Sequence, residues 1–258
     1  MQQDEKTAVL SKSFGAVADD YDRLRSAPPE DALDWLLPAG ATDALEIGAG
    51  TGLFTRKLAE RVPHVTALEP DARMRAVLAA RTPGVEVLDG HAEELPMDDG
   101  SFDVVTAQSA WHWVDEERAI PEVARVLRPG GRLALVWNGT NRTVDWMRNL
   151  WAGGVELDPA DRSQVDGRRR RRHQVDELTL REWFIDPETK LFTWTRTMTK
   201  DDLIALAATY SAVIVMDDEV KAAHLAGMRR YLDAHPELGQ GGLIDVPMRA
   251  FCWRSITR

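Results

Sequence analysis

The sequence contains only one cysteine, Cys252, so no disulfide can form within the chain. This scarcity is typical of a reducing compartment, and we expect a cytoplasmic protein in which Cys252 is a small buried apolar side chain. The sequence also lacks any run near the ~18 apolar residues that a membrane-spanning helix needs. Its first residues, Met-Gln-Gln-Asp-Glu-Lys, contain no apolar signal region. These absences argue against a disulfide scaffold, a secreted protein and a membrane protein.

The chain also lacks an excess of positive charge. It has 32 lysines and arginines against 42 aspartates and glutamates, a formal net charge of −10. Nucleic-acid binding requires a basic face, so no nucleic-acid partner is expected. The run Arg168–Arg172 is the exception; a solvated loop is the favoured interpretation, and the alternative is a cationic rim that attracts an anionic ligand. The six histidines form no HExxH or comparable cluster, so no metal site is indicated.

A chain of 258 residues, 44% hydrophobic and 29% charged, can bury one large core or a core with an appended lid. Apolar runs and helical patterns alternate along its first half, which predicts an α/β fold with a parallel sheet and helices on both faces. Ligands of such sheets bind beyond the carboxyl ends of the strands. Strands are predicted at 43–47, 64–68, 85–88, 102–107 and 131–137, and helices at 5–26, 29–37, 53–62, 71–81 and 115–127.

After residue 137 the sequence changes character. Residues 138–154 are rich in turn formers and tryptophan, which indicates an insertion after the fifth strand. Further helices are predicted at 177–184 and 200–235, and further strands at 190–197 and 246–256. We expect three segments along the chain: an N-terminal helical lid (1–40), a ligand-binding core (41–137), and a lid insertion with the closing strands of the same sheet (138–258).

Residues 44–52 (Ala-Leu-Glu-Ile-Gly-Ala-Gly-Thr-Gly) form the most informative motif of the chain. They combine a short apolar run, a carboxylate at Glu46, and glycines at Gly48, Gly50 and Gly52. The pattern predicts a buried strand that breaks into a tight turn before a helix. Such a unit lets a ligand approach bare backbone.

Two ligands suit this loop. A dinucleotide fingerprint has a third glycine three residues after the second, where this sequence has Leu53, and Glu46 would repel the pyrophosphate. S-adenosylmethionine carries an ammonium group that Glu46 could hold by a charge-assisted hydrogen bond. We therefore favour S-adenosylmethionine over a nicotinamide cofactor, which would make the chain an oxidoreductase.

The second predicted strand ends in Glu69, 21 residues after Gly48. An acidic residue at this offset is placed to accept both hydroxyls of a ribose, and a surface charge at a strand end is the alternative. Asp71 precedes an alternating apolar pattern, so it is predicted to cap the helix at 71–81.

With these motifs the sequence resembles the class I S-adenosylmethionine-dependent methyltransferases, specifically the small-molecule type 11 group. The resemblance covers about residues 40–137 in the right order and spacing, at 45–52, 65–71 with Met74, 89–96, 101–105 and 126–133. It implies a Rossmann-like, seven-stranded, mostly parallel sheet with an antiparallel last strand. It also implies S-adenosyl-L-methionine as cofactor and methyl transfer to a small-molecule acceptor.

The same resemblance implies cofactor contacts. The glycine loop, with Ala49, wraps the methionine and ribose in this family, and the residue matching Glu69 holds the ribose. The matched motifs add Pro70 and Met74 to the cofactor residues, and Gln108, after the fourth strand, is also assigned to the cofactor.

The loop matching residues 90–93 holds the adenine in this family, which assigns His91, Ala92 and Glu93. Members often carry Asp where this sequence has His91. A neutral imidazole nitrogen or the backbone of Ala92 would then replace that carboxylate, and an exposed loop histidine is the alternative.

The methyl acceptor is expected beyond the fourth strand, where residues 108–115 read Gln-Ser-Ala-Trp-His-Trp-Val-Asp. Trp111 could present an aromatic face to a sulfonium, worth about 0.5–2 kcal/mol. His112 is the candidate general base, because an imidazole titrates near neutral pH. Alternatively, His112 hydrogen-bonds within the fold or positions a substrate carboxylate. For the two tryptophans the alternative is that at least one of Trp111 and Trp113 packs in the core.

The N-terminal segment supplies further candidates. Phe14 and Tyr21 lie seven residues apart and share one face of a helix. In the methyltransferases that this sequence resembles, an aromatic lid of this kind closes over the cofactor, which assigns Tyr21 to the cofactor and Phe14 to the substrate. Ordinary helix packing is the alternative. Arg25 could pair with an acid group of the substrate or lie on the surface.

A weaker resemblance, to the trans-aconitate and cantharidin-type methyltransferases, rests on residues 111–115, on Trp137-Asn138 with Trp146, and on 246–252. It implies that Trp137 and Asn138 contact the acceptor, and it favours an anionic acceptor methylated at a carboxyl oxygen, which needs no base at neutral pH. Hydroxyl O-methylation is an alternative. Another is a regulatory or assembly protein that binds S-adenosylmethionine without turnover. The sequence does not determine the oligomeric state.

Overall fold

The computed structural model describes residues 18–155, 177–235, 238 and 242–258. Within these ranges no helix is long and apolar enough to cross a bilayer. The expected helix before residue 18, the side chain of Phe14 and the run Arg168–Arg172 lie outside the described residues.

The chain packs into two compact units, each with its own hydrophobic core. Unit 1 comprises Met1–Arg25, Gly139–Arg171 and Thr193–Arg249. Unit 2 comprises Ser26–Asn138, Arg172–Phe192 and Ala250–Arg258. The division into three successive segments stays a prediction, because units of packing need not follow the order of the chain.

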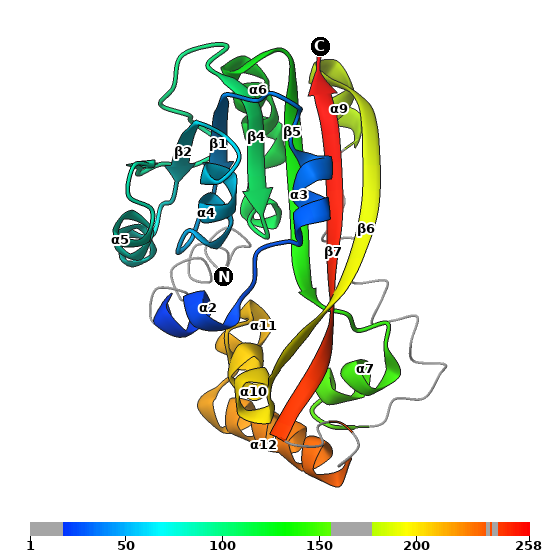
Figure 1. The fold of residues 1–258 in the computed structure, drawn as a ribbon. Coiled ribbons are helices and arrows are strands. Elements are labelled where there is room, and N and C mark those ends of the chain that lie inside the picture. Colours follow the sequence, from blue (N-terminus) through cyan, green and yellow to red (C-terminus); the bar gives the residue numbers. More distant parts are fainter. Residues whose placement is uncertain (1–17, 156–176, 236–237, 239–241) are drawn as a thin grey trace. The chain divides into compact units, whose positions relative to one another are not determined.

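A seven-stranded sheet has the order β3-β2-β1-β4-β5-β7-β6. Its strands are β1 (Asp43–Ile47), β2 (His64–Leu68), β3 (Glu86–Leu88), β4 (Phe102–Gln108), β5 (Leu127–Thr140), β6 (Phe184–Thr199) and β7 (Leu243–Thr257). The first five strands are parallel, and β7 is antiparallel to β5 (Figure 1). This topology confirms the predicted mostly parallel sheet with an antiparallel last strand.

Helices cover both faces of the sheet in unit 2, with α3 and α4 on one side and α6 on the other (Figure 1). The helices of this unit are α3 (Glu30–Leu36), α4 (Leu53–Ala59), α5 (Ala72–Arg81), α6 (Glu116–Val126) and α9 (Glu177–Trp183), with a 3₁₀ turn, η2, at Trp111–Trp113. Because both faces are covered, the central strands are almost continuously apolar: Ala44, Leu45 and Ile47 of β1 are all buried.

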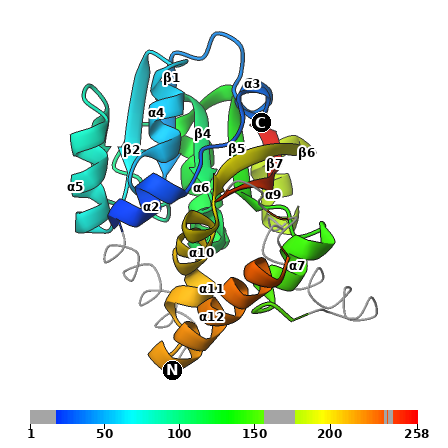
Figure 2. The same cartoon turned by 60° about the horizontal axis from the view of Figure 1, so that its bottom comes forward.

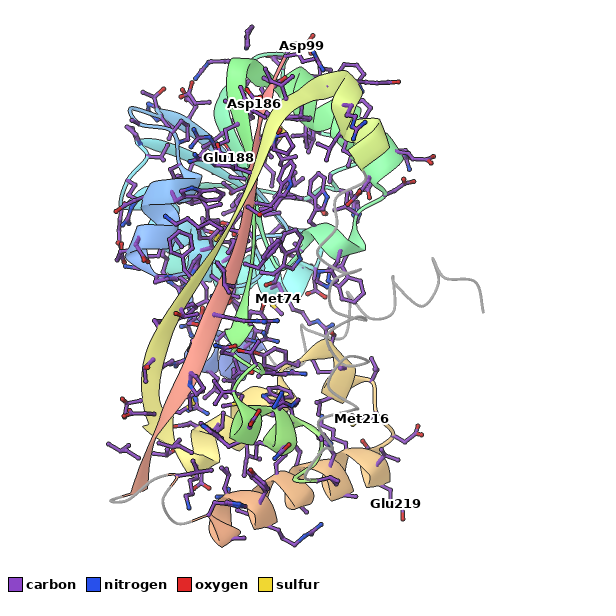
Figure 3. The ribbon with its side chains drawn as sticks, turned by 90° about the vertical axis from the view of Figure 1, so that its right-hand side faces the viewer. Met74, Asp99, Asp186, Glu188, Met216 and Glu219 are labelled. Atoms are coloured by element: carbon purple, nitrogen blue, oxygen red, sulfur yellow. The ribbon has the colours of Figure 1, made fainter. Side chains whose placement is uncertain are left out.

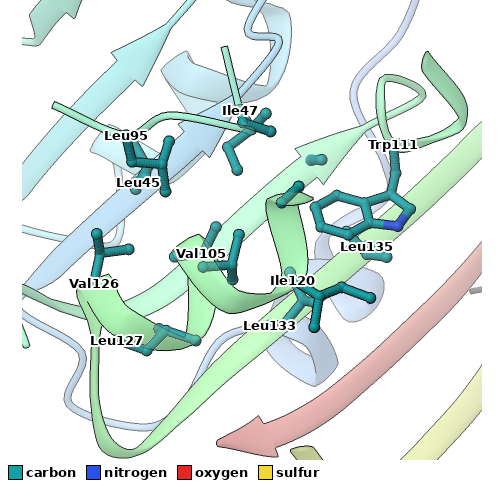
Figure 4. Close-up of a cluster of buried hydrophobic side chains, with 14 of the residues drawn as sticks. Leu45, Ile47, Leu95, Val105, Trp111, Ile120, Val126, Leu127, Leu133 and Leu135 are labelled. Carbon is teal, nitrogen blue, oxygen red and sulfur yellow. The ribbon is translucent and has the colours of Figure 1, made fainter. Parts of the chain in front are cut away.

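The core of unit 2 lies between α6 and the sheet (Figure 4). Val105 of β4 and Leu135 of β5 pack in one cluster with Ile120 and Val126 of α6. The buried α6 residues recur at helical spacing, so one stripe of the helix faces the strands. The ring of Trp111 closes the same cluster at the carboxyl end of β4.

Unit 1 is mainly helical apart from its strand segments. Its helices are α2 (Ala18–Leu24), α7 (Asp145–Trp151), α10 (Lys200–Ala208), α11 (Ser211–Ile214) and α12 (Asp218–Ala234). α12 contacts both α10 and α7 (Figure 2). Leu203, Met228 and Met147, one from each of these helices, are fully buried in its core.

The helix predicted over 200–235 is interrupted in the structure. Thr209 and Tyr210 donate their backbone N–H groups to Leu206 and Ala207, three residues back, so the α-helical pattern ends there. The hydroxyl of Thr209 also donates to the carbonyl of Leu206 at 2.7 Å. This side-chain bond competes with continuation of the helix.

Helix α7 lies where the sequence predicted only an insertion rich in turns. Its start at Val144 has no side-chain cap, so the usual N-terminal signal is missing. Met147, Leu150 and Trp151 are buried at helical spacing. Packing in unit 1 therefore stabilises a helix of seven residues, which is too short to show a clear period in the sequence.

The edge strand β6 is exposed from Ile185 to Leu191, and its charged side chains, among them Asp186 and Glu188, project from it (Figure 3). Glu188 pairs with Arg254 of β7, with Oε1 and Nη2 3.0 Å apart. Arg254 also lies over the ring of Trp35, 4.2 Å from its centroid. Charges along an exposed edge discourage pairing with another chain.

One carboxylate, Asp103, joins the amino-terminal ends of the central strands. Its Oδ2 accepts hydrogen bonds from the backbone amides of Thr42 (2.7 Å) and Asp43 (3.0 Å), and its Oδ1 accepts one from Arg128 Nη1 (2.6 Å). Desolvation alone would raise the pKa of Asp103, but the bonds from Arg128 and the two amides hold it well below its ordinary value. The carboxylate therefore stabilises the folded state at neutral pH.

We expect Asp103→Asn to lower the free energy of unfolding by about 1–3 kcal/mol at pH 7, because the amide removes a charged acceptor from four donors, the three above and the Thr42 hydroxyl. The folded pKa is depressed, so the contribution of the wild-type carboxylate is present above its unfolded pKa and is lost as the pH falls below it. Urea unfolding at pH 7 and at low pH measures both effects. Asp98→Asn, at an exposed position, is the control; equal stability of the two variants at pH 7 would contradict this role for Asp103.

Candidate functional site

The loop after β1 is held in a left-handed backbone conformation at three glycines. Gly48, Gly50 and Gly52 have φ angles of 65°, 60° and 86°. The backbone amides of Gly48 and Ala49 both donate to the carbonyl of Leu68 at the end of β2, at 2.8 and 3.1 Å. The turn is thereby fixed against the neighbouring strand, and Gly52 starts α4.

The three glycines differ in what a side chain would meet. A Cβ on Gly48 would lie 2.5 Å from the Cβ of Ala110, and one on Gly52 would lie 2.6 Å from Cδ1 of Leu78. Both positions therefore need glycine for packing as well as for φ. A Cβ on Gly50 would have no atom within 4 Å, so this stretch of backbone borders open space.

Glu69 follows β2 and is buried against the glycine loop. Its Oε2 accepts the backbone N–H of Gly50 at 2.8 Å, and its Oε1 accepts that of Asp71 at 2.9 Å. Burial raises the pKa of Glu69. Each carboxylate oxygen has a second acceptor site, so Glu69 can orient the loop and still accept hydroxyl donors.

Asp71 is the N-cap of α5, as the sequence predicted. Its side chain accepts from the backbone amides of Arg73 (2.9 Å) and Met74 (3.0 Å). Met74 is buried and Pro70 is exposed. The cap fixes the helix directly after Glu69, so it helps to hold that carboxylate in place.

Glu46 lies inside the protein, 1% exposed, and its Oε2 accepts the hydroxyl of Thr55 at 2.6 Å. Desolvation raises its pKa to about 8, and the charge of Glu69 adds to the rise. Glu46 is therefore mostly protonated at pH 7 in the protein alone. A bound cation would favour its ionised form, so the predicted contact with an ammonium group stays a prediction.

The loop at 90–93 turns beside the end of β3. His91 is exposed and forms an isolated antiparallel bridge with Glu94, while Ala92 is 2% exposed. Glu93 accepts the backbone N–H of Asp115 at 2.7 Å, which ties this loop to the segment before α6. The adenine contacts of these residues stay predictions.

At the carboxyl ends of β4 and β5 two amide side chains converge. Gln108 and Asn138 both donate to the carbonyl of Ser26, at 3.2 and 2.7 Å. The Gln108 Oε1 is buried with no hydrogen-bond partner among the described residues. The next residue, Ser109, has a φ of 55°, a conformation that costs a non-glycine residue about 1–2 kcal/mol.

The Trp-His-Trp segment forms η2. Trp111 is 1% exposed and donates its indole N–H to Glu116 at 2.8 Å, so the structure gives it a role in the core. His112 is half-buried, with its ring 4.6 Å from that of Trp113. Trp137 is buried beside Phe251. The acceptor contacts predicted for Trp111 and Trp137, and the base predicted at His112, stay predictions.

Tyr21 and Arg25 belong to unit 1 and are not part of the unit 2 cluster just described. Arg25 donates to the hydroxyl of Thr209 (2.9 Å) and to its carbonyl (3.0 Å). Its guanidinium lies 5.0 Å from the centroid of the Tyr21 ring. Their predicted contacts with cofactor and substrate are not tested by these positions.

Sequence reasoning missed two groups in this site. Thr55 lies in the middle of α4 and carries no motif, yet its hydroxyl satisfies Glu46. The carbonyl of Ser26 joins Gln108 and Asn138 from far along the chain. A backbone carbonyl leaves no trace in residue type, so no sequence signal could have indicated it.

Comparison with known proteins agrees with this geometry. The family model described as a methyltransferase domain matches residues 45–135. An uncharacterized methyltransferase of Mycobacterium tuberculosis (strain ATCC 25618 / H37Rv) is 41% identical over 246 residues, 95% of this chain and 96% of that protein. The chain belongs to the class I S-adenosylmethionine-dependent methyltransferases.

Two further similarities broaden this comparison. The malonyl-[acyl-carrier protein] O-methyltransferase of Methylococcus capsulatus (strain ATCC 33009 / NCIMB 11132 / Bath) is 37% identical over 150 residues, 54% of each chain. A structure of a proposed type II methyltransferase from Anaeromyxobacter dehalogenans has a TM-score of 0.64 at 23% identity, covering 91% of this chain and 97% of that one. This second likeness shows the fold alone.

The methyltransferase therefore uses S-adenosylmethionine, and the residues of unit 2 fit it. The bare backbone at Gly50 leaves room for a ligand, and the buried Glu69 has acceptor sites left for ribose hydroxyls. Glu46 and Glu69 also place two acids at one loop, which suits a cofactor that carries positive charge. A pyrophosphate would gain no charge attraction from these two acids.

We expect the buried Glu46 to make the methyltransferase less stable as the pH rises. Its pKa is about 8 in the folded protein against an ordinary 4.5, so the folded state binds the extra proton between these values. The stability of the protein without cofactor should then fall from about pH 5 to pH 8 by up to about 1.4 kcal/mol per pH unit, and level off above.

Glu46→Gln should remove this slope, because a neutral amide can still accept from Thr55. Chemical unfolding at pH 5.5, 7 and 8.5 measures it for the two proteins, with exposed Glu182→Gln as the control. Parallel pH profiles for wild type and Glu46→Gln would show that Glu46 keeps an ordinary pKa.

Proposed function

We propose that this methyltransferase transfers the methyl group of S-adenosylmethionine to a carboxyl oxygen of a small acidic molecule. The observation that carries the proposal is the convergence of Gln108 and Asn138 at the carboxyl ends of β4 and β5. Gln108 Nε2 donates to the Ser26 carbonyl and, at 3.5 Å, to Asn138 Oδ1, which holds the Asn138 amide in place. The second N–H of Asn138 Nδ2 can donate to a carboxylate and orient it, and a carboxylate needs no base at neutral pH.

The distant likeness to a malonyl-[acyl-carrier protein] O-methyltransferase supports this acceptor chemistry over about half of the chain. The M. tuberculosis relative covers almost all of the chain, but its printed name specifies no acceptor. The proposal therefore rests on the donors at the strand ends together with that partial likeness.

The residues of unit 2 have separate roles in the proposed reaction. When bound, S-adenosylmethionine supplies an electrophilic methyl group on a sulfonium. Glu69 holds the Gly50 amide and accepts the ribose hydroxyls, which fixes the cofactor against the loop. Gln108 and Asn138, held by the Ser26 carbonyl, orient the attacking oxygen. His112 lies four residues after Gln108 and positions the acceptor, or takes its proton if the acceptor is a hydroxyl.

Replacing Glu69 tests the cofactor assignment. Glu69→Gln should weaken binding of S-adenosylmethionine and S-adenosylhomocysteine at least tenfold, because it removes charge-assisted hydrogen bonds worth about 1.5–3 kcal/mol each. Calorimetric titration measures this affinity. The exposed Glu86→Gln on β3 is the matched control and should bind both ligands as the wild type does. Unchanged affinity in Glu69→Gln would contradict the proposed contact between Glu69 and the ribose.

Methyl transfer to a panel of small carboxylic acids, phenols and amines tests the acceptor. Labelled methyl groups should appear in base-labile esters of the acids. His112→Ala should keep cofactor affinity and lower turnover. A rate that falls below pH ~6.5 in the wild type and not in the variant identifies His112 as a base, whereas a raised KM with an unchanged pH profile identifies a positioning residue. Transfer to phenols or amines alone would overturn the carboxyl acceptor.

A further inference from the structure

A buried threonine of α4 contacts a carboxyl group of β1. The hydroxyl of Thr55 donates to Oε2 of Glu46 at 2.6 Å, and the two residues are 0% and 1% exposed. Within the described part of the chain, Thr55 is the only hydrogen-bond donor to Glu46. The carboxyl group is therefore held through one oxygen, and its Oε1 is left without a donor from those residues.

This contact lies beside the glycine loop. A Cβ placed on Gly52 would lie 3.7 Å from the Oγ1 of Thr55, so the hydroxyl borders the last glycine of the loop. Glu46 stands two residues before Gly48 on β1. The hydrogen bond therefore joins the two elements that the loop connects, β1 and α4, next to the backbone that is open at Gly50.

Local preference does not explain a threonine at this position. In a helix interior its branched side chain loses rotamer freedom, and its hydroxyl competes for backbone groups. Valine has nearly the same shape and leaves no buried hydroxyl to satisfy. The helix itself thus gives no reason for the hydroxyl of Thr55, whereas the bond to Glu46 does.

The charges that act on Glu46 come from two neighbouring elements. Glu69, after β2, disfavours the ionised form of Glu46, and Arg56 of α4 favours it. Burial is the largest effect and raises the pKa of Glu46, whereas the hydrogen bond from Thr55 lowers it. Because Oε2 accepts from Thr55, the proton of the neutral acid belongs on Oε1, the oxygen without another donor.

We propose that Thr55 is a positioning residue for the cofactor: it holds Glu46 by Oε2, so that Oε1 exchanges its proton for the ammonium group of S-adenosylmethionine. In this exchange the O–H bond of Glu46 breaks, the proton passes to solvent, and an N–H of the ammonium donates to the carboxylate. Cofactor binding therefore releases a proton and weakens as the pH falls. The inference concerns the cofactor alone and does not depend on the proposed carboxyl acceptor.

Calorimetric titration with S-adenosylhomocysteine, which has the same ammonium group, tests the exchange between pH 6 and 8.5. Titrations in two buffers of different ionisation enthalpy give the number of protons released. In the wild type the affinity should rise up to about tenfold per pH unit and level off near pH 8. About one proton should be released at pH 6.5, and Glu46→Gln should lack both this proton and the rise in affinity.

Thr55→Val keeps the shape of the side chain and removes its hydroxyl. It should lower the affinity about tenfold at pH 7 and move the levelling of the profile to higher pH, because the ionised form of Glu46 loses its donor. Thr55→Ser keeps the hydroxyl and should restore the wild-type profile. Thr66→Val is the matched control, because it removes a buried hydroxyl bonded to Glu86 at 3.0 Å, between β2 and β3. Its affinity and proton release should equal those of the wild type.

Two results for Thr55→Val overturn the positioning role. One is a pH profile identical to that of the wild type, and the other is an affinity lowered by the same factor at every pH, which a merely structural role would produce. If Thr55→Val does not fold, equal proton release by wild type and Glu46→Gln overturns the exchange at Glu46. None of these titrations contains a methyl acceptor, so failure of this inference is distinguishable from failure of the proposed carboxyl acceptor.

Discussion

The site of unit 2 depends on one close approach of backbone to backbone. The carbonyl that ends β2, at Leu68, accepts both amides at the start of the glycine loop, and this is possible only because Gly48 turns with a positive φ. A side chain at Gly48 would strike Ala110 after β4, and one at Gly52 would strike α5. The loop is therefore packed between the ends of three elements, β2, β4 and α5. Gly50 alone is left open, and its amide is the one that Glu69 holds. Packing thus determines which part of the loop can meet a ligand.

The electrostatics of this loop follow from the same packing. Glu46 and Glu69 are buried side by side, and each has a raised pKa because water is excluded. Two buried acids cost stability unless they are protonated, hydrogen-bonded or paired with a cation. In the protein alone, hydrogen bonds from the Thr55 hydroxyl and from two backbone amides offset part of this loss of stability. A positively charged ligand would offset the remaining loss of stability and shift Glu46 towards its ionised form. The loop is therefore better suited to a cationic cofactor than to an anionic one.

The sequence predicted the parts of this molecule that depend on local pattern. The bounds of β1 and β2, the cap at Asp71 and the antiparallel last strand agree with the structure, because apolar runs, capping residues and family motifs are local signals. It did not predict α7, which has no cap and too few residues to show a period. It left open whether Trp111 packs in the core or meets the acceptor; the structure buries the ring and places its N–H on Glu116, and the acceptor contact stays a prediction. The helix α7 and the burial of Trp111 both depend on which distant residues pack nearby, and residue type does not carry that information.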